Sequence, residues 1–226
     1  MNYFEKDAIS ATLLKAVIKQ SPVHAEERMK NFKATPNMKL GTAFHAKILE
    51  LPEYDNLIAV SPDCDKRTKA GKETHAKFLE TVGDKTVITP DQSVLVENMA
   101  QACMSHPQVQ RLIEQCYATE MEIDFEFDNM ACKSKIDMVD DSGTIVDIKT
   151  CQDASPEGFK RASANFLYHV QLAWYARAMG IDWKDVDAYI IAVENTAPHG
   201  VAVYKFSTNA ILNGWELCKR GVAMWK

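Results

Sequence analysis

The spacing of hydrophobic residues changes near residue 120, from a helical period to a period of two. In the first half of the chain, apolar residues recur every three to four positions, as they do over residues 13–18 after Ser10. This pattern predicts an amphipathic helix over residues 11–19 with Ser10 as its N-cap. By the same criteria we expect further helices over about 24–32 and 38–51, a helix ending near 79, helices over 90–104 and from 107, and short strands over 56–60 and 86–88.

From Glu120 onward, apolar and acidic residues alternate, which is typical of a strand with one buried face and one solvated face. Turn residues at 128–129 and 141–143 then separate two further strands, expected over 132–139 and 144–150. Three strands joined by tight turns form an antiparallel meander. The second half of the chain is therefore expected to be built on a sheet.

Beyond Pro156 the pattern predicts a short helix, a long helix over about 166–179 that Gly180 closes, strands over 186–193 and 201–206, and a final helix over 208–225. Repeats and linkers are not evident. We therefore expect one α/β (α+β) domain over residues 1–226, with a mainly helical portion over 1–117 and a core over 118–226. Its mixed central sheet would contain the antiparallel meander and be flanked by helices.

Composition narrows the class of protein. With 26 Lys and Arg against 31 Asp and Glu, the net charge is −5, which disfavours coating of nucleic acid by bulk electrostatics but allows local contact. The longest apolar run, 188–193, is far shorter than the about 20 residues that span a bilayer, so we expect no membrane association. The acidic start, 1–7, does not resemble a secretory signal, and the six cysteines form no C-x-x-C pair. A cytoplasmic protein with reduced thiols is expected.

Two acidic residues and a lysine are the strongest candidates for chemistry. Asp147 and Lys149 lie two residues apart on one predicted strand, so they share a face while Ile148 points into the core. Asp137 lies on the neighbouring strand and can face both. Two carboxylates and the Ile148 backbone carbonyl could hold Mg²⁺, and the lysine could orient or deprotonate a water molecule. The alternative is a salt-bridge cluster on the solvated face of the sheet.

Four elements in order strengthen the catalytic interpretation: Gly41-Thr-Ala-Phe-His45, Asp137, Asp147-Ile-Lys149 and Tyr168-His-Val-Gln171-Leu-Ala-Trp-Tyr175. Together they resemble the PD-(D/E)XK nuclease superfamily, in particular its RecB-like branch and the RecE-type phage and prophage exonucleases, which include exodeoxyribonuclease VIII. The resemblance covers most of the chain and implies a restriction-endonuclease-like core. Asp147 stands where much of the superfamily has glutamate, which shortens the reach of the carboxylate but keeps its charge.

The resemblance also implies roles for individual residues. His45, Asp137 and Asp147 would be metal ligands, Lys149 the catalytic lysine, and Gln171 and Tyr175 would line the substrate side of the site. The cofactor would be Mg²⁺, with Mn²⁺ able to substitute and two ions expected per site. From the residues alone, His45 could instead be a core histidine, and Gln171 and Tyr175 could be polar edges of a packed helix.

Three other polar features have two interpretations each. The most basic stretch of the chain suggests contact with DNA phosphates, although a solubilising loop has the same composition; it contains Lys66, Arg67, Lys69 and Lys72. Glu122 could contact a metal through water, but a solvated acidic face explains it better. His169 flanks the glutamine motif and could support the site indirectly.

The function implied by the resemblance is a Mg²⁺-dependent 5′→3′ exonuclease that degrades linear double-stranded DNA. It would leave 3′ overhangs for a RecT-like single-strand annealing protein and assemble as a ring-shaped homo-oligomer, a tetramer in preference to a trimer. One alternative is a RecB-like or Cas4-like nuclease with another polarity or endonuclease activity, although the chain has no G-x-x-x-x-G-K-[ST] motif and only Cys218 near its C-terminus. A catalytically idle scaffold that binds DNA ends is the other.

Overall fold

A serine or threonine hydroxyl caps most helices of the computed structural model, which describes residues 3–226. At these caps the hydroxyl accepts a hydrogen bond from the backbone N–H three residues later, a donor that the helix itself leaves free. Ser10 is confirmed as the cap of the first helix. The helices are α1 (Ala11–Lys19), α2 (Pro22–Lys30), α3 (Pro36–Leu49), α4 (Tyr54–Leu57), α5 (Lys69–Thr81), α6 (Pro90–Met104), α7 (Pro107–Gln115), α8 (Pro156–Phe166), α9 (Tyr168–Ala178) and α10 (Thr208–Trp225), with single 3₁₀ turns at Tyr3–Glu5 and Leu51–Glu53.

Five strands form one mixed sheet in the order β3-β4-β5-β6-β7. Strands β3 (Cys116–Phe127), β4 (Met130–Asp140) and β5 (Ile145–Cys151) make the predicted antiparallel meander. Strand β6 (Ala188–Glu194) is parallel to β5, and β7 (Val201–Lys205) is antiparallel to β6. Parallel neighbours need a crossover connection, which α8 and α9 provide. The predicted fold class, α/β with a mixed sheet and an antiparallel meander, is confirmed.

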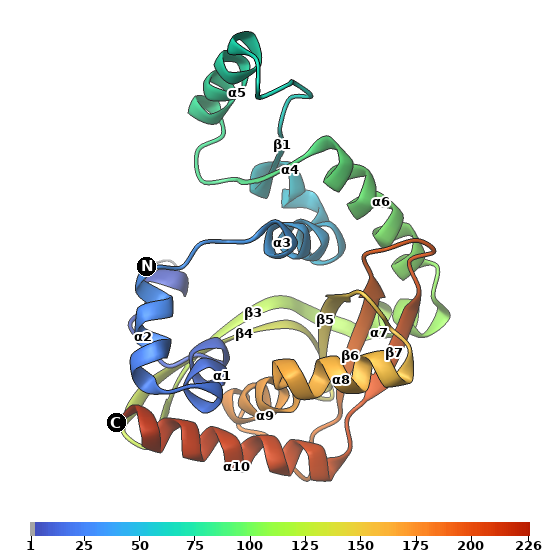
Figure 1. Ribbon diagram of the computed structural model, residues 1–226. Coiled ribbons are helices and arrows are strands. Elements are labelled where there is room, and N and C mark those ends of the chain that lie inside the picture. The colour runs from blue at the N-terminus through green and yellow to red at the C-terminus, as the bar shows by residue number, and fades with distance from the viewer. Residues whose placement is uncertain (1–2) are drawn as a thin grey trace.

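Helices cover both faces of this sheet, and each face has its own hydrophobic core (Figure 1). On one face α1, α9 and α10 pack around the fully buried Trp174, whose indole N–H donates to the Lys133 carbonyl at 3.1 Å. The ring of Phe125 lies 5.0 Å from the Trp174 ring. On the other face α3, α6 and α7 enclose Phe44 and Ile148. Strand β5 is thus buried from both sides.

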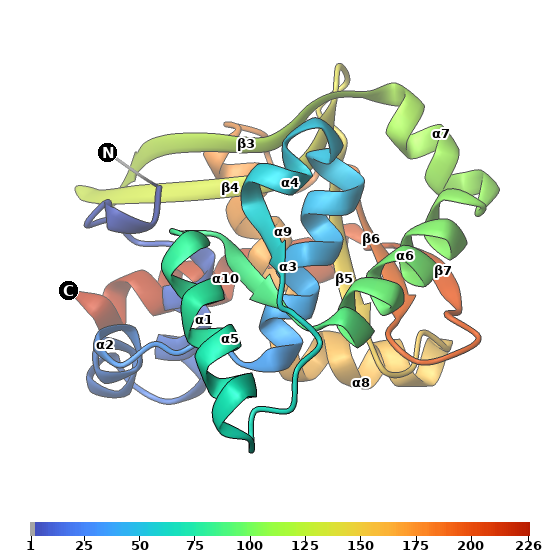
Figure 2. The ribbon, with the colours of Figure 1, turned by 90° about the horizontal axis from the view of Figure 1, so that it is seen from above.

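The chain between α3 and α6 extends away from the large sheet and forms a lobe at the top of Figure 1. This outer lobe, residues 50–89, contains α4, α5 and the strands β1 (Ile58–Val60) and β2 (Thr86–Ile88), which pair in parallel. Ile58 and Ile88 pack with Leu40 of α3 in a third cluster. Figure 1 shows α5 beyond α3, on the side that faces away from the sheet, and in the view from above α5 lies toward the viewer and beside α3 (Figure 2). The lobe is therefore fastened to the rest of the molecule through α3.

Several element boundaries differ from the sequence predictions, among them those of the long helix expected after Pro156, of β3 and of β1. The helix expected over 166–179 is divided, because Leu167 has a left-handed backbone (φ 53°) that ends α8 and allows α9 to start in a new direction. Strand β3 begins at Cys116 instead of Glu120. The strand expected over 56–60 begins only at Ile58, since the preceding residues form α4. The spacing of apolar residues gives no signal for any of these differences.

Within residues 3–226 no helix combines the length and the apolar character that a bilayer crossing requires. The six cysteines are all free thiols. The expectation that the protein is not exported rests on the acidic residues 1–7. Two of these, Met1 and Asn2, lie outside the described residues.

Candidate active site

Asp137, Asp147 and Lys149 come together where strands β4 and β5 separate. The backbone pairing of these strands includes Met138–Val146. At the adjacent position of β4, the side chain of Asp137 replaces the backbone pairing. Its Oδ2 atom accepts a hydrogen bond from the Ile148 N–H at 2.8 Å. A carboxylate thus occupies the place of a strand carbonyl, which fixes the Asp137 side chain against β5. Ile148 itself points into the core and is fully buried.

The side chains of Asp147 and Lys149 lie on the same side of β5, as strand alternation predicts. Asp147 is 1% exposed, and its Oδ2 atom is 2.5 Å from Lys149 Nζ. The ring of Tyr168 faces the same ammonium group, with its centroid 5.8 Å away. The lysine is therefore held in one position by a buried counter-charge and an aromatic ring.

Helix α3 adds His45 to this group. The neighbouring residues Ala43, Phe44 and Ala46 are buried, so α3 lies firmly on the sheet and directs His45 toward β4. His45 Nδ1 is 3.5 Å from Asp137 Oδ2. The ring of His45 therefore contacts a carboxylate as well as the apolar neighbours of its helix.

Glu120 is the residue of this cluster that the sequence analysis missed. Ligand atoms of His45, Glu120 and Asp137 all lie within 4.8 Å of one another. Strand alternation predicts that Glu120 lies on the solvated face of β3 together with Glu122, but its backbone is left-handed (φ 50°), which interrupts the alternation there. Its side chain also pairs with Lys135 at 2.5 Å. A left-handed non-glycine residue inside a strand is uncommon, and such conformations gather at functional sites.

Gln171 on α9 connects Asp147 to two further side chains. Its amide nitrogen donates to Asp147 Oδ1 at 2.9 Å and to the Tyr175 hydroxyl at 2.6 Å. Its amide oxygen accepts a hydrogen bond of 2.6 Å from Lys15 on α1. The predicted pairing of Gln171 and Tyr175 on one helix face is therefore present, and Lys15 joins them without any sequence signal beyond its place in an amphipathic helix.

Burial and neighbouring charges shift the pKa values of these groups. Burial, reinforced by the nearby charge of Asp147, raises the pKa of Asp137 to about 6. Burial alone would lower the pKa of Lys149, but the charges of Asp147 and Asp137 outweigh it and raise that pKa above its usual value. Burial, together with the charge of Lys149, lowers the pKa of Lys15 to about 8. Two carboxylates that repel each other in a buried place are suited to a cation.

The donor atoms fit a divalent cation. An imidazole nitrogen and carboxylate oxygens within 4.8 Å of one another match the ligand preferences of Mn²⁺, and the carboxylates match those of Mg²⁺. Asp147 lies beside this group, since its charge raises the pKa of Asp137, but it is engaged by Lys149 and Gln171. The metal position that the geometry favours is therefore bounded by His45, Glu120 and Asp137.

The basic stretch of the sequence lies elsewhere, in the outer lobe at the start of α5. The side chain of Arg67 is 92% exposed and pairs with Asp65, and Lys69 is 93% exposed and 4.0 Å from Glu73. Lys66 is exposed as well, and so is Lys72. The structure does not bring these cations beside the carboxylates.

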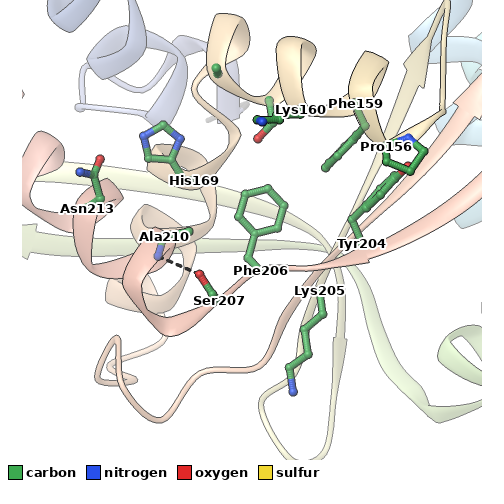
Figure 3. Close-up of a pocket in the computed structure, with 12 residues that line it drawn as sticks. Pro156, Phe159, Lys160, His169, Tyr204, Lys205, Phe206, Ser207, Ala210 and Asn213 are labelled. Carbon is green, nitrogen blue, oxygen red and sulfur yellow. Dashed lines mark hydrogen bonds between the residues drawn. The ribbon is translucent and has the colours of Figure 1, made fainter.

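Two other candidates also lie outside the cluster. His169 lines a separate pocket of about 490 Å³ between α8, β7 and α10, in which the rings of Phe159 and Tyr204 stack with centroids 3.9 Å apart (Figure 3). None of the predicted catalytic or metal-binding residues lines this pocket. Glu122 is 42% exposed and 3.7 Å from Lys6, as expected for a solvated acidic face.

The chain matches a family of known domains and resembles solved structures in fold. A family described as "PDDEXK-like domain of unknown function (DUF3799)" matches residues 10–225. The crystal structure of a candidate exonuclease from Eubacterium rectale is similar in fold, with a TM-score of 0.71 and 12% identity over 98% of this chain and 82% of that one. The structure of SSO0001 also aligns over 98% of this chain and 78% of that one at 12% identity, but its TM-score is 0.40. No curated protein sequence matches the chain.

Proposed function

The chain belongs to the family of PDDEXK-like domains, and from its site we propose that it is a metal-dependent nuclease that hydrolyses phosphodiester bonds in DNA. One observation carries the proposal: Lys149 is paired with Asp147 at 2.5 Å, beside a His45–Glu120–Asp137 group that can hold a divalent cation. This combination of a fixed ammonium and a cation site suits a substrate that is already negative and gains charge in its transition state.

His45, Glu120 and Asp137 would hold the ion, and we propose Asp147 and the Ile148 carbonyl as further ligands. The ion would polarise a phosphate oxygen and lower the pKa of a bound water molecule. We propose Mg²⁺ as the physiological ion, with Mn²⁺ able to substitute and two ions per site.

Lys149 would act as a cation in this site. Because its pKa is raised, it carries a proton at neutral pH, so it donates a hydrogen bond to the attacking water or to a phosphate oxygen. Asp147 holds the ammonium in place, and Gln171 in turn orients Asp147 through the 2.9 Å hydrogen bond from its amide nitrogen. Tyr175 supports Gln171 from the next turn of α9. The chain's own residues thus position the nucleophile and stabilise charge in the transition state.

The resemblance of the sequence motifs to those of RecE-type exonucleases supports a more specific proposal. We propose a 5′→3′ exonuclease acting on linear double-stranded DNA, formed by a single nuclease domain over residues 1–226 and working in the cytoplasm. Its product would be 3′ overhangs for a RecT-like annealing protein, and its assembly a ring-shaped homo-oligomer, a tetramer in preference to a trimer. The cations of the outer lobe would then contact duplex phosphates at a distance from the cut; these are Lys66, Arg67, Lys69 and Lys72.

Digestion of linear duplex DNA labelled separately at each 5′ and 3′ end tests this proposal. Reactions would contain Mg²⁺, Mn²⁺ or EDTA, with Lys149→Ala and a closed circular duplex as controls. We expect metal-dependent release of 5′ nucleotides from the linear DNA alone, and a loss of about 100-fold or more in Lys149→Ala, the size of effect that removal of one transition-state donor has. Cutting of the circle would indicate an endonuclease, and failure to cut any DNA would contradict the proposal in favour of a binding scaffold.

A further inference from the structure

A cleft of about 690 Å³ opens beside Lys149, between helices α1 and α2 on one side and α8 and α9 on the other. Lys149 and Gln171 line its inner end, so the cleft is continuous with the candidate active site. The ends of α1 and α8 meet at its rim, where Lys19 Nζ donates to the Asn165 carbonyl at 2.8 Å. Its volume lies within the range of about 300–1,000 Å³ that is usual for ligand pockets.

The charge of this cleft is opposite to that of the whole protein. Its lining includes Lys15, Lys19, Arg28 and Lys149, and among the described residues that line it none is acidic, although the net charge of the chain is −5. Lys15 donates a hydrogen bond to Gln171, and Lys149 forms an ion pair with Asp147. Of the remaining two cations, Lys19 uses one of its three donor hydrogens on the Asn165 carbonyl and keeps the others for an anion.

Lys19 and Arg28 are these two outer cations. Both side chains are exposed, and Arg28 makes no ion pair with any residue from 3 to 226 that the structure describes. The charge of Arg28 contributes to lowering the pKa of Lys15, behind burial and the charge of Lys149, so it acts at the cleft rather than away from it. Lys19, too, is in no ion pair within the described part of the chain, so an anion entering here would meet two positive groups that no carboxylate of residues 3–226 pairs with. Phosphate groups of a polynucleotide are such anions.

An exposed aromatic ring lies in the same cleft. Phe166, the last residue of α8, is 58% exposed and lines the cleft together with Tyr168. The two rings are stacked at an angle of 19°, with their centroids 5.9 Å apart. The left-handed turn at Leu167 separates the two residues and so places both rings on the same wall. An aromatic face beside cations is the combination by which proteins bind unpaired bases and their phosphates.

We propose that this cleft binds a single-stranded segment of DNA next to the bond being cut, with backbone phosphates on Lys19 and Arg28 and a base stacked on Phe166. The inference rests on the proposed nuclease function for its place beside the cut, but the binding itself does not need turnover. A single strand fits better than a duplex, because a base must be unpaired and unstacked before its face can lie on an aromatic ring. The basic stretch of the outer lobe plays no part in this site.

The test is the affinity of a fluorescent oligothymidylate, measured by anisotropy in EDTA so that the strand is not cut. The variants are Lys19→Ala, Arg28→Ala, Phe166→Ala and Phe166→Trp. Matched controls are Lys205→Ala, which removes an exposed cation from β7, and Tyr117→Ala, which removes an exposed ring from β3. Each measurement is repeated over a range of salt concentrations.

We expect the two kinds of variant to differ. Lys19→Ala and Arg28→Ala should each weaken binding and reduce the slope of log affinity against log salt by about 0.7, the value for one phosphate contact of a single strand. Phe166→Ala should weaken binding by roughly 5- to 150-fold at an unchanged salt slope, since stacking contributes about 1–3 kcal/mol per base. Phe166→Trp should bind like the wild type. A variant that merely disturbed the fold would not change the affinity while leaving the salt slope unchanged in one case and reduced in the other.

Failure of this inference can be told apart from failure of the proposed function. If the three alanine variants bind like the two controls, or if the wild type does not bind the oligonucleotide, the cleft proposal is overturned whatever the digestion assay gives. If binding is weakened as expected in a protein that cuts no DNA with any metal, the cleft is supported and the nuclease proposal is contradicted.

Discussion

Lys15 on α1 donates a hydrogen bond of 2.6 Å to the amide oxygen of Gln171 on α9. An ammonium group can only donate, so this contact requires the Gln171 oxygen to face Lys15 and leaves its amide nitrogen for Asp147, 2.9 Å away. The first long helix of the chain thereby determines the orientation of a side chain in the site. Lys15 is accordingly a positioning residue, one step removed from the proposed chemistry.

We predict that Lys15→Met lowers kcat at least about tenfold and changes KM much less. A hydrogen bond to a charged group contributes about 1.5–3 kcal/mol, and each 1.36 kcal/mol corresponds to a factor of ten in rate. Methionine keeps the length of the side chain and its packing but cannot hold the Gln171 amide. Steady-state digestion of labelled duplex gives both constants, and the control is Lys30→Met, at an exposed lysine of α2 that does not line the cleft beside Lys149. An unchanged kcat would exclude a positioning role for Lys15.

The lowered pKa of Lys15 also predicts how stability depends on pH. Burial and the charge of Lys149 bring this pKa to about 8, so between about pH 8 and its ordinary value of 10.5 the unfolded chain binds a proton that the folded chain has released. The free energy of unfolding should therefore rise with pH in that window. Tyrosines and cysteines titrate in the same range, so the measured quantity is the difference between wild type and Lys15→Met in urea titrations from pH 7 to 10. The free energy of unfolding of the wild type should rise relative to that of Lys15→Met as pH rises. A difference that stays constant with pH would contradict the prediction.

Glu120 offers a test of the metal position with a matched control. Glu120→Gln removes one carboxylate from the His45–Glu120–Asp137 group, whereas Glu122→Gln removes one from the solvated face of the same strand. We expect Glu120→Gln to weaken Mn²⁺ binding in isothermal titration calorimetry at least about tenfold, a loss that even residues outside the ligand set can cause. Glu122→Gln should bind Mn²⁺ like the wild type. Equal Mn²⁺ affinities in the two variants would show that Glu120 is not a ligand of the ion.

Strand alternation explains how much of this site can be predicted from the sequence. A period of two places Asp147 and Lys149 on one side of β5 and Ile148 on the other. This prediction uses only neighbouring residues of the sequence. The turn at 141–143 then places Asp137 on the strand beside them. These elements follow from local rules, and the structure has them where the sequence predicts them.

Glu120 and Lys15 show what local rules leave out. Alternation groups Glu120 with Glu122, and only the left-handed backbone at Glu120 turns it toward His45. Composition gives no signal for such a conformation in a residue other than glycine. Lys15 lies on a helix whose polar positions would normally face water, and it is enclosed only because α9, far away in the sequence, packs against α1.

Asp137→Asn should stabilise the metal-free protein while removing metal binding. Burial and the charge of Asp147 raise the pKa of Asp137 to about 6, so the folded chain keeps a proton that the unfolded chain loses above its ordinary value of 3.8. The free energy of unfolding of the wild type in EDTA should therefore fall as pH rises through this window, and it should fall less in the variant. Asparagine can still accept the Ile148 N–H. Urea titrations at pH 4, 6 and 8 in EDTA measure this, and a variant less stable than wild type at pH 8 would contradict it.

Two helical glycines make a final matched pair. A Cβ atom at Gly214 on α10 would lie 2.1 Å from the backbone oxygen of His169 on α9, whereas a Cβ atom at Gly41 on α3 would meet only Thr150 Oγ1 at an ordinary 3.7 Å. Gly214→Ala must therefore push α10 away from the helix that carries Gln171, and overpacking of this kind costs about 1–3 kcal/mol or more. Gly41→Ala should be neutral or stabilising by up to about 1 kcal/mol, since alanine is the better helix former. Thermal unfolding of both variants decides the matter, because a Gly214→Ala protein as stable as Gly41→Ala would mean that α9 and α10 do not cross as closely as described.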